Sequence, residues 1–130
     1  MINRPLKVLV VDDEPDIVEI LSYNLIKENF EVSKAYNGYE AVSFALKNHP
    51  DLIIMDIRMP EMNGIEACRM IKKNEQMKDI PVLFLTADND EYTSLSAVEA
   101  GGDHFVTKPI RPSILMGMIH ELIKSHPNEH

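Results

Sequence analysis

The sequence predicts a single doubly wound α/β domain, in which a parallel five-stranded sheet is covered by helices on both faces. The main observation is that apolar, strand-like runs alternate with helix-like segments five times along the chain. The length of 130 residues fits one ordinary domain, and 45% hydrophobic with 26% charged residues is typical of a globular chain. We expect the domain to cover residues 1–125 and the polar residues 126–130 to form a tail or the start of a linker.

Five short runs are the expected strands of this sheet. Most are continuous apolar runs, which is typical of strands buried on both faces of a parallel sheet. The second run differs, because Phe30 and Val32 alternate with Glu31 and Ser33, and this alternation predicts a half-exposed strand at a sheet edge. The expected strands are residues 6–11, 30–35, 52–55, 81–85 and 104–107.

Between these runs, apolar residues recur every three or four positions, as they do on the buried face of a helix. The turn signal Asn37-Gly38 precedes the second helix, and Pro112 begins the last one. In the weakly patterned fourth helix, Leu95 and Val98 are expected to face inward. The other predicted inward positions are Ile17, Val18, Ile20, Leu21 and Leu25, then Ala41, Val42, Ala45 and Leu46, then Ile65, Cys68 and Ile71, and finally Ile114, Leu115, Met118, Ile119, Leu122 and Ile123.

The charge balance and the cysteine count exclude several classes of function. Thirteen basic residues against 21 acidic ones give a net charge of −8, which argues against nucleic-acid binding by this chain alone. The single cysteine, Cys68, rules out an internal disulfide and a multi-cysteine zinc site. No apolar run reaches the length of a membrane span or of a signal-peptide core, so we expect no membrane association and a cytoplasmic location.

Polar residues that carry chemistry follow four of the five expected strands. Asp12 and Asp13 follow the first strand, Asp56 the third, Thr86 the fourth and Lys108 the fifth. In a flavodoxin-like sheet of order 2-1-3-4-5, the first and third strands are neighbours, so three carboxylates are expected to meet in the crevice beyond the strand ends. Carboxylates this close repel one another unless a cation lies between them. Hard divalent ions such as Mg²⁺ or Mn²⁺ prefer oxygen ligands, so we expect one of them here.

Carboxylates, a divalent ion, a lysine and a hydroxyl together form a site for phosphoryl transfer, because the cations stabilise a highly anionic transition state. A carboxylate can itself be the nucleophile and form an acyl phosphate, and Asp56, at the end of the central strand, is the best candidate. Taken singly, these residues also have structural explanations: Asp12 or Asp13 can cap the first helix, and Thr86 can cap a later one. Such separate explanations do not predict that all of them share one crevice.

Four motifs follow expected strands in the order of the chain. They are Val10-Val11-Asp12-Asp13-Glu14-Pro15, Asp56-Ile57-Arg58-Met59-Pro60-Glu61-Met62-Asn63-Gly64, Leu85-Thr86-Ala87 and Thr107-Lys108-Pro109. Each motif alone is weak, but the four together, over about residues 5–125, resemble the response-regulator receiver domains of two-component signalling. The resemblance implies a signalling module rather than an enzyme, with only self-phosphotransfer and slow autodephosphorylation.

The resemblance implies a phosphoacceptor and a metal site. Asp56 would take a phosphoryl group from the phosphohistidine of a sensor histidine kinase or a phosphotransfer protein. Asp13 would bind Mg²⁺ directly, Asp12 directly or through water, and Asp56 and the main-chain carbonyl of Arg58 would complete the protein ligands.

The resemblance also implies a phosphoryl-binding group and a switch. Thr86 and the amide of Ala87 would hold phosphoryl oxygens, and Lys108 would pair with the phosphoryl group and precede Pro109 in a cis peptide bond. On phosphorylation, Thr86 and Phe105 would move and change the face formed by the fourth helix, the fifth strand and the fifth helix. Because Phe105 lacks the hydroxyl of the commoner tyrosine, this switch would depend on packing alone.

Two further expectations concern the mouth of the site and the output. Arg58 and Asp88 would border the phosphoryl group, pair with each other and slow its hydrolysis. The stretch from Gly101 to Pro112 resembles receivers attached to DNA-binding output domains, which dimerise on phosphorylation through a charged ladder. His104 and Met118 depart from that ladder, so the output, a linked domain or a separate target protein, and the homodimer stay open.

Three other interpretations fit the sequence less well. A Mg²⁺-dependent phosphatase of the haloacid-dehalogenase type also has an aspartate nucleophile, but it needs a second acid where this chain has Arg58 and a cap that the length does not allow. A flavodoxin-like cofactor binder needs a phosphate-binding loop after the first strand, where Asp12, Asp13 and Glu14 would repel phosphate. A receiver-like module that no longer accepts phosphate is disfavoured by the intact acids and Lys108.

Overall fold

In a computed structural model, which describes residues 4–87 and 91–125, five parallel strands form one sheet in the order β2-β1-β3-β4-β5. The predicted fold class and strand order are therefore confirmed. The strands are β1 (Lys7–Val11), β2 (Glu31–Ala35), β3 (Leu52–Asp56), β4 (Val82–Thr86) and β5 (His104–Thr107). The helices are α1 (Pro15–Lys27), α2 (Gly38–Asn48), α3 (Gly64–Lys73), α4 (Glu91–Glu99) and α5 (Pro112–Ser125). The expected tail, residues 126–130, lies outside the described residues.

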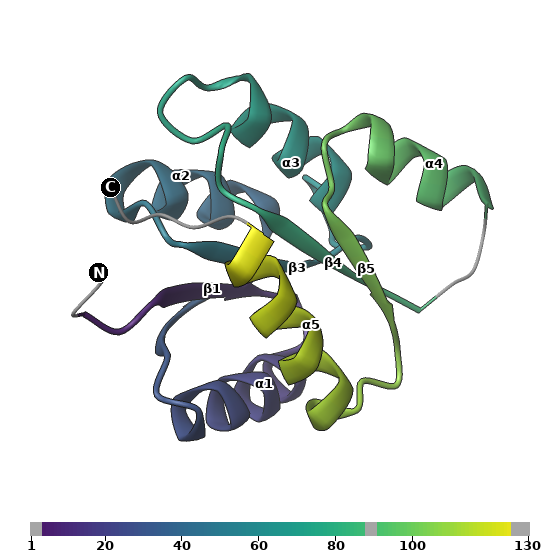
Figure 1. Ribbon diagram of the computed structural model, residues 1–130. Coiled ribbons are helices and arrows are strands. Elements are labelled where there is room, and N and C mark those ends of the chain that lie inside the picture. The colour runs from purple at the N-terminus through teal and green to yellow at the C-terminus, as the bar shows by residue number, and fades with distance from the viewer. Residues whose placement is uncertain (1–3, 88–90, 126–130) are drawn as a thin grey trace.

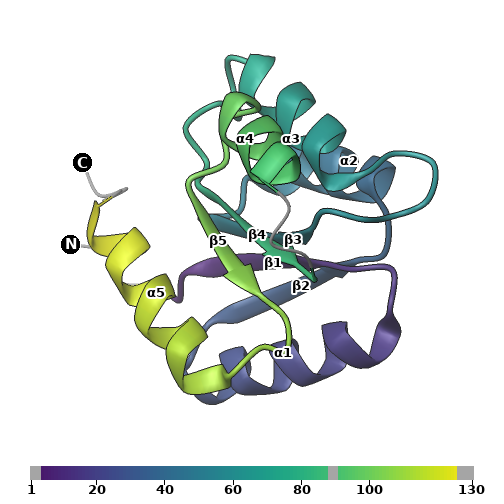
Figure 2. The same ribbon diagram turned by 90° about the vertical axis from the view of Figure 1, so that its right-hand side faces the viewer.

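The sheet separates two layers of helices. Helices α1 and α5 cover one face, and α2, α3 and α4 cover the other (Figure 1 and, turned by 90°, Figure 2). Successive strand residues point to opposite faces, so in β1 Val8 and Val10 belong to the core under α1 and α5, while Leu9 and Val11 belong to the core under the other helices. This two-sided cover explains why β3 and β4 are buried along their whole length.

Strand β2 lies at an edge of the sheet, as its alternating pattern predicts. Glu31 and Lys34 are exposed at this edge, and Ala35 at its end is buried. Charged side chains of this kind keep an edge strand from pairing with other chains. The strands that carry the predicted site residues therefore lie inside the sheet or at its other edge, at β5.

The helix faces differ from the prediction at several positions. In α4, Leu95 and Val98 are 59% and 53% exposed, and among the residues of this helix whose burial is described, Ala97 is the fully buried one. The expectation for this helix was wrong because it assigned the larger apolar residues to the core, whereas the space beside α4 accommodates alanine. Ile20, Leu46 and Ile114 are likewise exposed rather than inward, and Cys68 is buried as predicted. Among the described residues, no helix is both long and apolar enough to cross a membrane.

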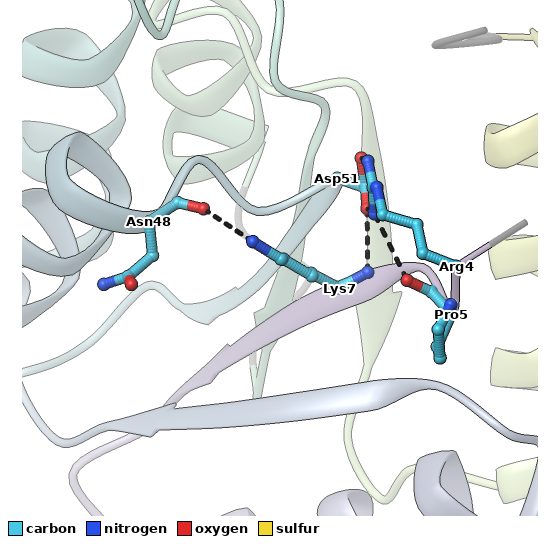
Figure 3. A network of polar contacts seen from close by, with 5 residues as sticks. All are labelled: Arg4, Pro5, Lys7, Asn48 and Asp51. Carbon is cyan, nitrogen blue, oxygen red and sulfur yellow. Dashed lines mark hydrogen bonds and ion pairs between the residues drawn. The ribbon is translucent and has the colours of Figure 1, made fainter. Parts of the chain in front are cut away.

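The end of the sheet where the strands begin is held together by a polar network (Figure 3). The guanidinium of Arg4 donates two hydrogen bonds to Asp51, at 2.9 and 3.1 Å, and the main-chain N–H of Lys7 donates a third at 2.8 Å. Asp51 is only 7% exposed, and the main chain of Asp51 in turn donates to the carbonyl of Lys7 at 2.8 Å. The network thus joins the residues before β1 to the residue before β3, at the end of the sheet opposite the predicted site.

Candidate functional site

The carboxyl ends of β1, β3, β4 and β5 place the predicted site residues around one hollow. Asp12 directly follows β1, Asp56 and Thr86 are the last residues of β3 and β4, and Lys108 directly follows β5. Because these strands are parallel, their ends meet on the same side of the sheet. The hollow has a volume of about 370 Å³ and is lined by Asp13, Glu14, Asp56, Arg58, Thr86, Ala87 and Lys108.

Three carboxylates converge at this hollow. Asp12, Asp13 and Asp56 each offer an oxygen, and these oxygens lie within 4.8 Å of one another. Asp12 is fully buried and Asp56 is 5% exposed, whereas Asp13 is exposed. Closely spaced carboxylate oxygens with one open side are the donor set that Mg²⁺ prefers, so the residues present fit a hard divalent cation.

The ammonium of Lys108 lies among these acids. Its Nζ is 3.1 Å from Oδ2 of Asp12, 3.2 Å from Oδ1 of Asp56 and 3.4 Å from Oε1 of Glu14. Burial lowers the pKa of Lys108, but the attraction of Asp56 and Asp12 outweighs this and the pKa is raised overall. Lys108 therefore stays charged and partly neutralises the acids around it.

The positive charge of Lys108 is too small to balance the acids completely. Burial, together with repulsion from Asp12, raises the pKa of Asp56 to about 6 in spite of the neighbouring ammonium. Burial also raises the pKa of Asp12, against the opposing effects of its hydrogen bonds. Without a further cation, the site carries two carboxylates that ionise reluctantly.

Asp12 is positioned by the start of α1. Its Oδ1 accepts a 3.0 Å hydrogen bond from the main-chain N–H of Glu14, and its own main-chain N–H donates to the carbonyl of Ala35 at 3.3 Å. The N-cap residue of α1 is Glu14, whose own side chain makes no capping hydrogen bond. Neither Asp12 nor Asp13 is therefore the N-cap residue of α1, although the carboxylate of Asp12 binds the main-chain N–H of that residue.

The ends of β4 and β5 bring the remaining predicted residues to the hollow. Thr86 is 7% exposed and its carbonyl accepts a 2.7 Å hydrogen bond from the main-chain N–H of Lys108. Ala87 is exposed at the rim. The peptide bond between Lys108 and Pro109 is cis.

The loop between β3 and α3 lies against the phosphoacceptor candidate. The N–H of Gly64 donates to the carbonyl of Ile57 at 2.8 Å, and a Cβ at this glycine would collide with the main-chain oxygen of Asp56. Only glycine therefore lets the start of α3 approach so closely. Arg58 in this loop is exposed and lines the hollow, and its expected partner Asp88 lies outside the described residues.

The expected switch residue Phe105 is half-buried on β5. Its ring stacks on that of Phe84, with the ring centroids 6.1 Å apart and the planes inclined by 22°. Phe84 is fully buried on β4, in register with Phe105. The buried ring of Phe84 thus packs against the ring of Phe105, the predicted switch residue.

Glu14 was not among the residues predicted for the site, although its carboxylate reaches Lys108 from the start of α1. The signal was its position directly after Asp12 and Asp13, which places a third acid at the same strand end.

Comparisons with known proteins show one family and one fold. The sequence model of the response regulator receiver domain family matches residues 8–120. A signal receiver domain of a histidine kinase from Syntrophus aciditrophicus is 34% identical, with a TM-score of 0.87 over 95% of this chain and 94% of that one. A chemotaxis protein from Vibrio cholerae is 32% identical, with a TM-score of 0.86 over 90% of this chain and 98% of that one. A CheY-like receiver domain protein from Methanospirillum hungatei is 25% identical, with a TM-score of 0.90 over 97% and 99%.

Proposed function

Because this chain belongs to the family of response regulator receiver domains of two-component signalling, we propose that Asp56 is its phosphoacceptor. The donor we propose is the phosphohistidine of a sensor histidine kinase or of a phosphotransfer protein. One observation carries the proposal: the buried Asp56 carboxylate lies 3.2 Å from the Lys108 ammonium and within 4.8 Å of two further acids. Such a site suits a nucleophilic carboxylate that must meet an anionic phosphoryl group.

The proposed reaction is a transfer between two side chains. An oxygen of the ionised Asp56 attacks phosphorus, the bond from phosphorus to the imidazole nitrogen breaks, and its electron pair stays on that nitrogen. The pKa of Asp56, raised to about 6, still leaves the carboxylate largely ionised at neutral pH. Lys108 neutralises phosphoryl charge, while the Thr86 hydroxyl and the Ala87 amide bind phosphoryl oxygens.

Receiver domains bind Mg²⁺ at an acidic pocket, and we infer that this chain does so through Asp12, Asp13, Asp56 and the carbonyl of Arg58. When bound, the ion supplies positive charge that offsets both the acids and the phosphoryl oxygens. The chain's own residues bind and orient the phosphoryl group. We expect only this self-phosphotransfer and slow autodephosphorylation, with no turnover of another substrate.

The surface beside the site supports a protein as the phosphodonor. Helix α1 exposes Ile20, Tyr23 and Ile26, at 56%, 65% and 57% of their surfaces. A largely apolar hollow of about 220 Å³ lies beside it, lined by residues of α1 and of the loop after β5, with Lys108 in its wall. An apolar helix face beside Lys108 fits a helix of the donor protein. The lone buried thiol of Cys68 suits the cytoplasm, where we place this exchange.

We infer that phosphorylation changes the face formed by α4, β5 and α5. The added phosphoryl charge would lie beside Thr86. The main-chain carbonyl of Thr86 accepts a hydrogen bond from the main-chain N–H of Lys108, and Phe105 lies three residues before that lysine. The exposed Leu95 and Val98 make part of this face apolar, which suits an output domain, a target protein or a second copy. With a phosphoryl mimic bound, the amide chemical shifts of α4, β5 and α5 should change. Unchanged shifts would contradict this switch.

Intact-mass spectrometry after incubation with acetyl phosphate, with and without Mg²⁺, tests the phosphoacceptor. We expect one added phosphoryl group in the wild type and in the control Asp79→Asn, which changes an exposed acid outside the lining of the site. We expect none in Asp56→Asn or without the metal ion. An adduct that survives in Asp56→Asn would show that another residue is the nucleophile, and no adduct in the wild type, with rapid quenching and several small donors, would contradict the proposal.

A further inference from the structure

Glu14 makes a contact that the proposed transfer does not use. Its Oε1 lies 3.4 Å from Nζ of Lys108, and the side chain is 63% exposed. The other two acids around this ammonium, Asp12 and Asp56, are buried. Glu14 is therefore the outermost of three carboxylates that share one lysine, and it stands at the mouth of the hollow.

The charges at this mouth do not balance. Four acids, Asp12, Asp13, Glu14 and Asp56, face two cations, Lys108 and Arg58. The proposed divalent ion would neutralise the remainder only when it is bound. A negatively charged donor that enters the hollow thus passes close to Glu14 and is repelled by its carboxylate. The same carboxylate also offsets part of the positive charge with which Lys108 would attract the donor.

We propose that Glu14 is a specificity-determining residue that disfavours small, freely diffusing phosphodonors of high negative charge. The proposal rests on the phosphoacceptor role of Asp56. The penalty grows with the net charge of the donor, because each negative charge on it interacts separately with the Glu14 carboxylate. A protein donor is affected less, because contact with the apolar face of α1 supplies binding that a small molecule lacks.

Two small donors test whether the penalty depends on donor charge, because they deliver the same phosphoryl group but differ in net charge. Acetyl phosphate is a dianion at neutral pH. Phosphoramidate carries one negative charge overall because its nitrogen is protonated, and it breaks a phosphorus–nitrogen bond as phosphohistidine does. In both reactions Asp56 oxygen bonds to phosphorus, and the electron pair of the broken bond leaves with acetate or with ammonia, which keeps the protons of the donor nitrogen.

The test is the initial rate of phosphorylation with each donor at saturating Mg²⁺, followed by intact mass, in the wild type and in Glu14→Gln. We expect a rise of about threefold with phosphoramidate and about tenfold with acetyl phosphate, so that the ratio of the two rates rises about threefold. High ionic strength should remove most of this difference, because salt screens charges at an exposed position. The matched control Glu31→Gln, at the start of the edge strand β2, should leave both rates unchanged.

A rise of the same size with both donors, or no rise, would overturn the proposal, since neither depends on donor charge. A loss of rate with both donors, in a variant whose thermal unfolding matches the wild type, would show that Glu14 positions Lys108 and does not select donors. If neither protein takes a phosphoryl group from either donor, the phosphoacceptor role fails and this inference fails with it. If both donors phosphorylate the wild type but the ratio of their rates is the same in Glu14→Gln, the inference about Glu14 fails and the phosphoacceptor role of Asp56 stands.

Discussion

The main chain of Lys108 is bonded directly to that of Thr86, with a distance of 2.7 Å between the lysine nitrogen and the threonine oxygen. The two residues that we propose to bind the phosphoryl group are thus joined by a main-chain hydrogen bond between the ends of β4 and β5. A main-chain shift of Thr86 toward a phosphoryl group would therefore be transmitted to the residue after β5, the strand in which Phe105 lies stacked on Phe84. This relationship gives the proposed switch a physical route from the site to the output face.

Replacing Asp56 by asparagine should stabilise the metal-free protein above pH 6. The pKa of Asp56 is raised from 3.8 to about 6, so the folded state holds this proton more tightly than the unfolded chain does. Wild-type stability therefore falls as the pH rises through this interval, and asparagine removes the loss. Urea unfolding in EDTA should show a gain of about 1–3 kcal/mol for Asp56→Asn at pH 8 that vanishes below pH 3.8. A gain that does not depend on pH would contradict this explanation.

Mg²⁺ should stabilise the folded protein, and Asp13→Asn should remove most of this effect. An ion that binds only the folded state adds about 1.4 kcal/mol at ten times its dissociation constant. Asp13 is exposed, so its replacement should change metal binding more than folding. Thermal unfolding with increasing Mg²⁺ checks this, and Asp79→Asn should keep the full response. An undiminished response in Asp13→Asn would place the ion elsewhere.

Loss of Arg4 should destabilise the fold more than loss of an exposed ion pair. Arg4→Met leaves the carboxylate of Asp51, which is 7% exposed, without its bidentate partner, and we expect a loss of about 1–2 kcal/mol in chemical unfolding. The matched control is Lys34→Met, because Lys34 pairs with Glu19 at the same distance of 2.9 Å on the surface. That variant should unfold like the wild type. Equal effects of the two substitutions would show that burial of Asp51 does not matter.

Ser22→Ala should make the protein more stable. Ser22 on α1 is 2% exposed, and among the described residues its Oγ is a buried side-chain oxygen without a hydrogen-bond partner. Alanine removes the desolvated hydroxyl and favours the helix, so we expect a gain of about 0.5–1 kcal/mol. Ser43→Ala, at an exposed position of α2, measures the contribution of helix propensity alone. If both variants gain equally, the buried hydroxyl has no cost.

The inward face of α4 can be checked with two opposite changes. Leu95→Ala should cost less than about 0.5 kcal/mol, because Leu95 is 59% exposed. Ala97→Leu should cost about 1–3 kcal/mol, because Ala97 is fully buried and the larger side chain overpacks the core. Unfolding curves compare the two variants. A larger loss of stability in Leu95→Ala than in Ala97→Leu would show that Leu95 faces inward, as the sequence pattern predicts.

The sheet and most of the site were predictable because they depend on local signals. An apolar run that stops at an acid, as at Asp56, marks both the strand and the side of the sheet to which the acid belongs. The inward face of α4 was not predictable in this way, because choosing between Leu95 and Ala97 requires the distance between helix and sheet. The contact of Arg4 with Asp51 was missed for a related reason, since it joins segments 47 residues apart in the chain. Glu14 was missed because its reach to Lys108 depends on how α1 begins.

The network of Arg4, Lys7 and Asp51 lies at the amino ends of the strands, and the proposed phosphoacceptor Asp56 lies at their carboxyl ends. The network therefore contributes to folding stability at the end of the sheet opposite the proposed signalling chemistry. Substitutions around Asp51 can therefore adapt the protein to a warmer or colder habitat while the proposed phosphoryl site is left unaltered. A bioengineer who needs a more stable receiver for a synthetic circuit should keep Arg4 and Asp51 unchanged and begin at Ser22.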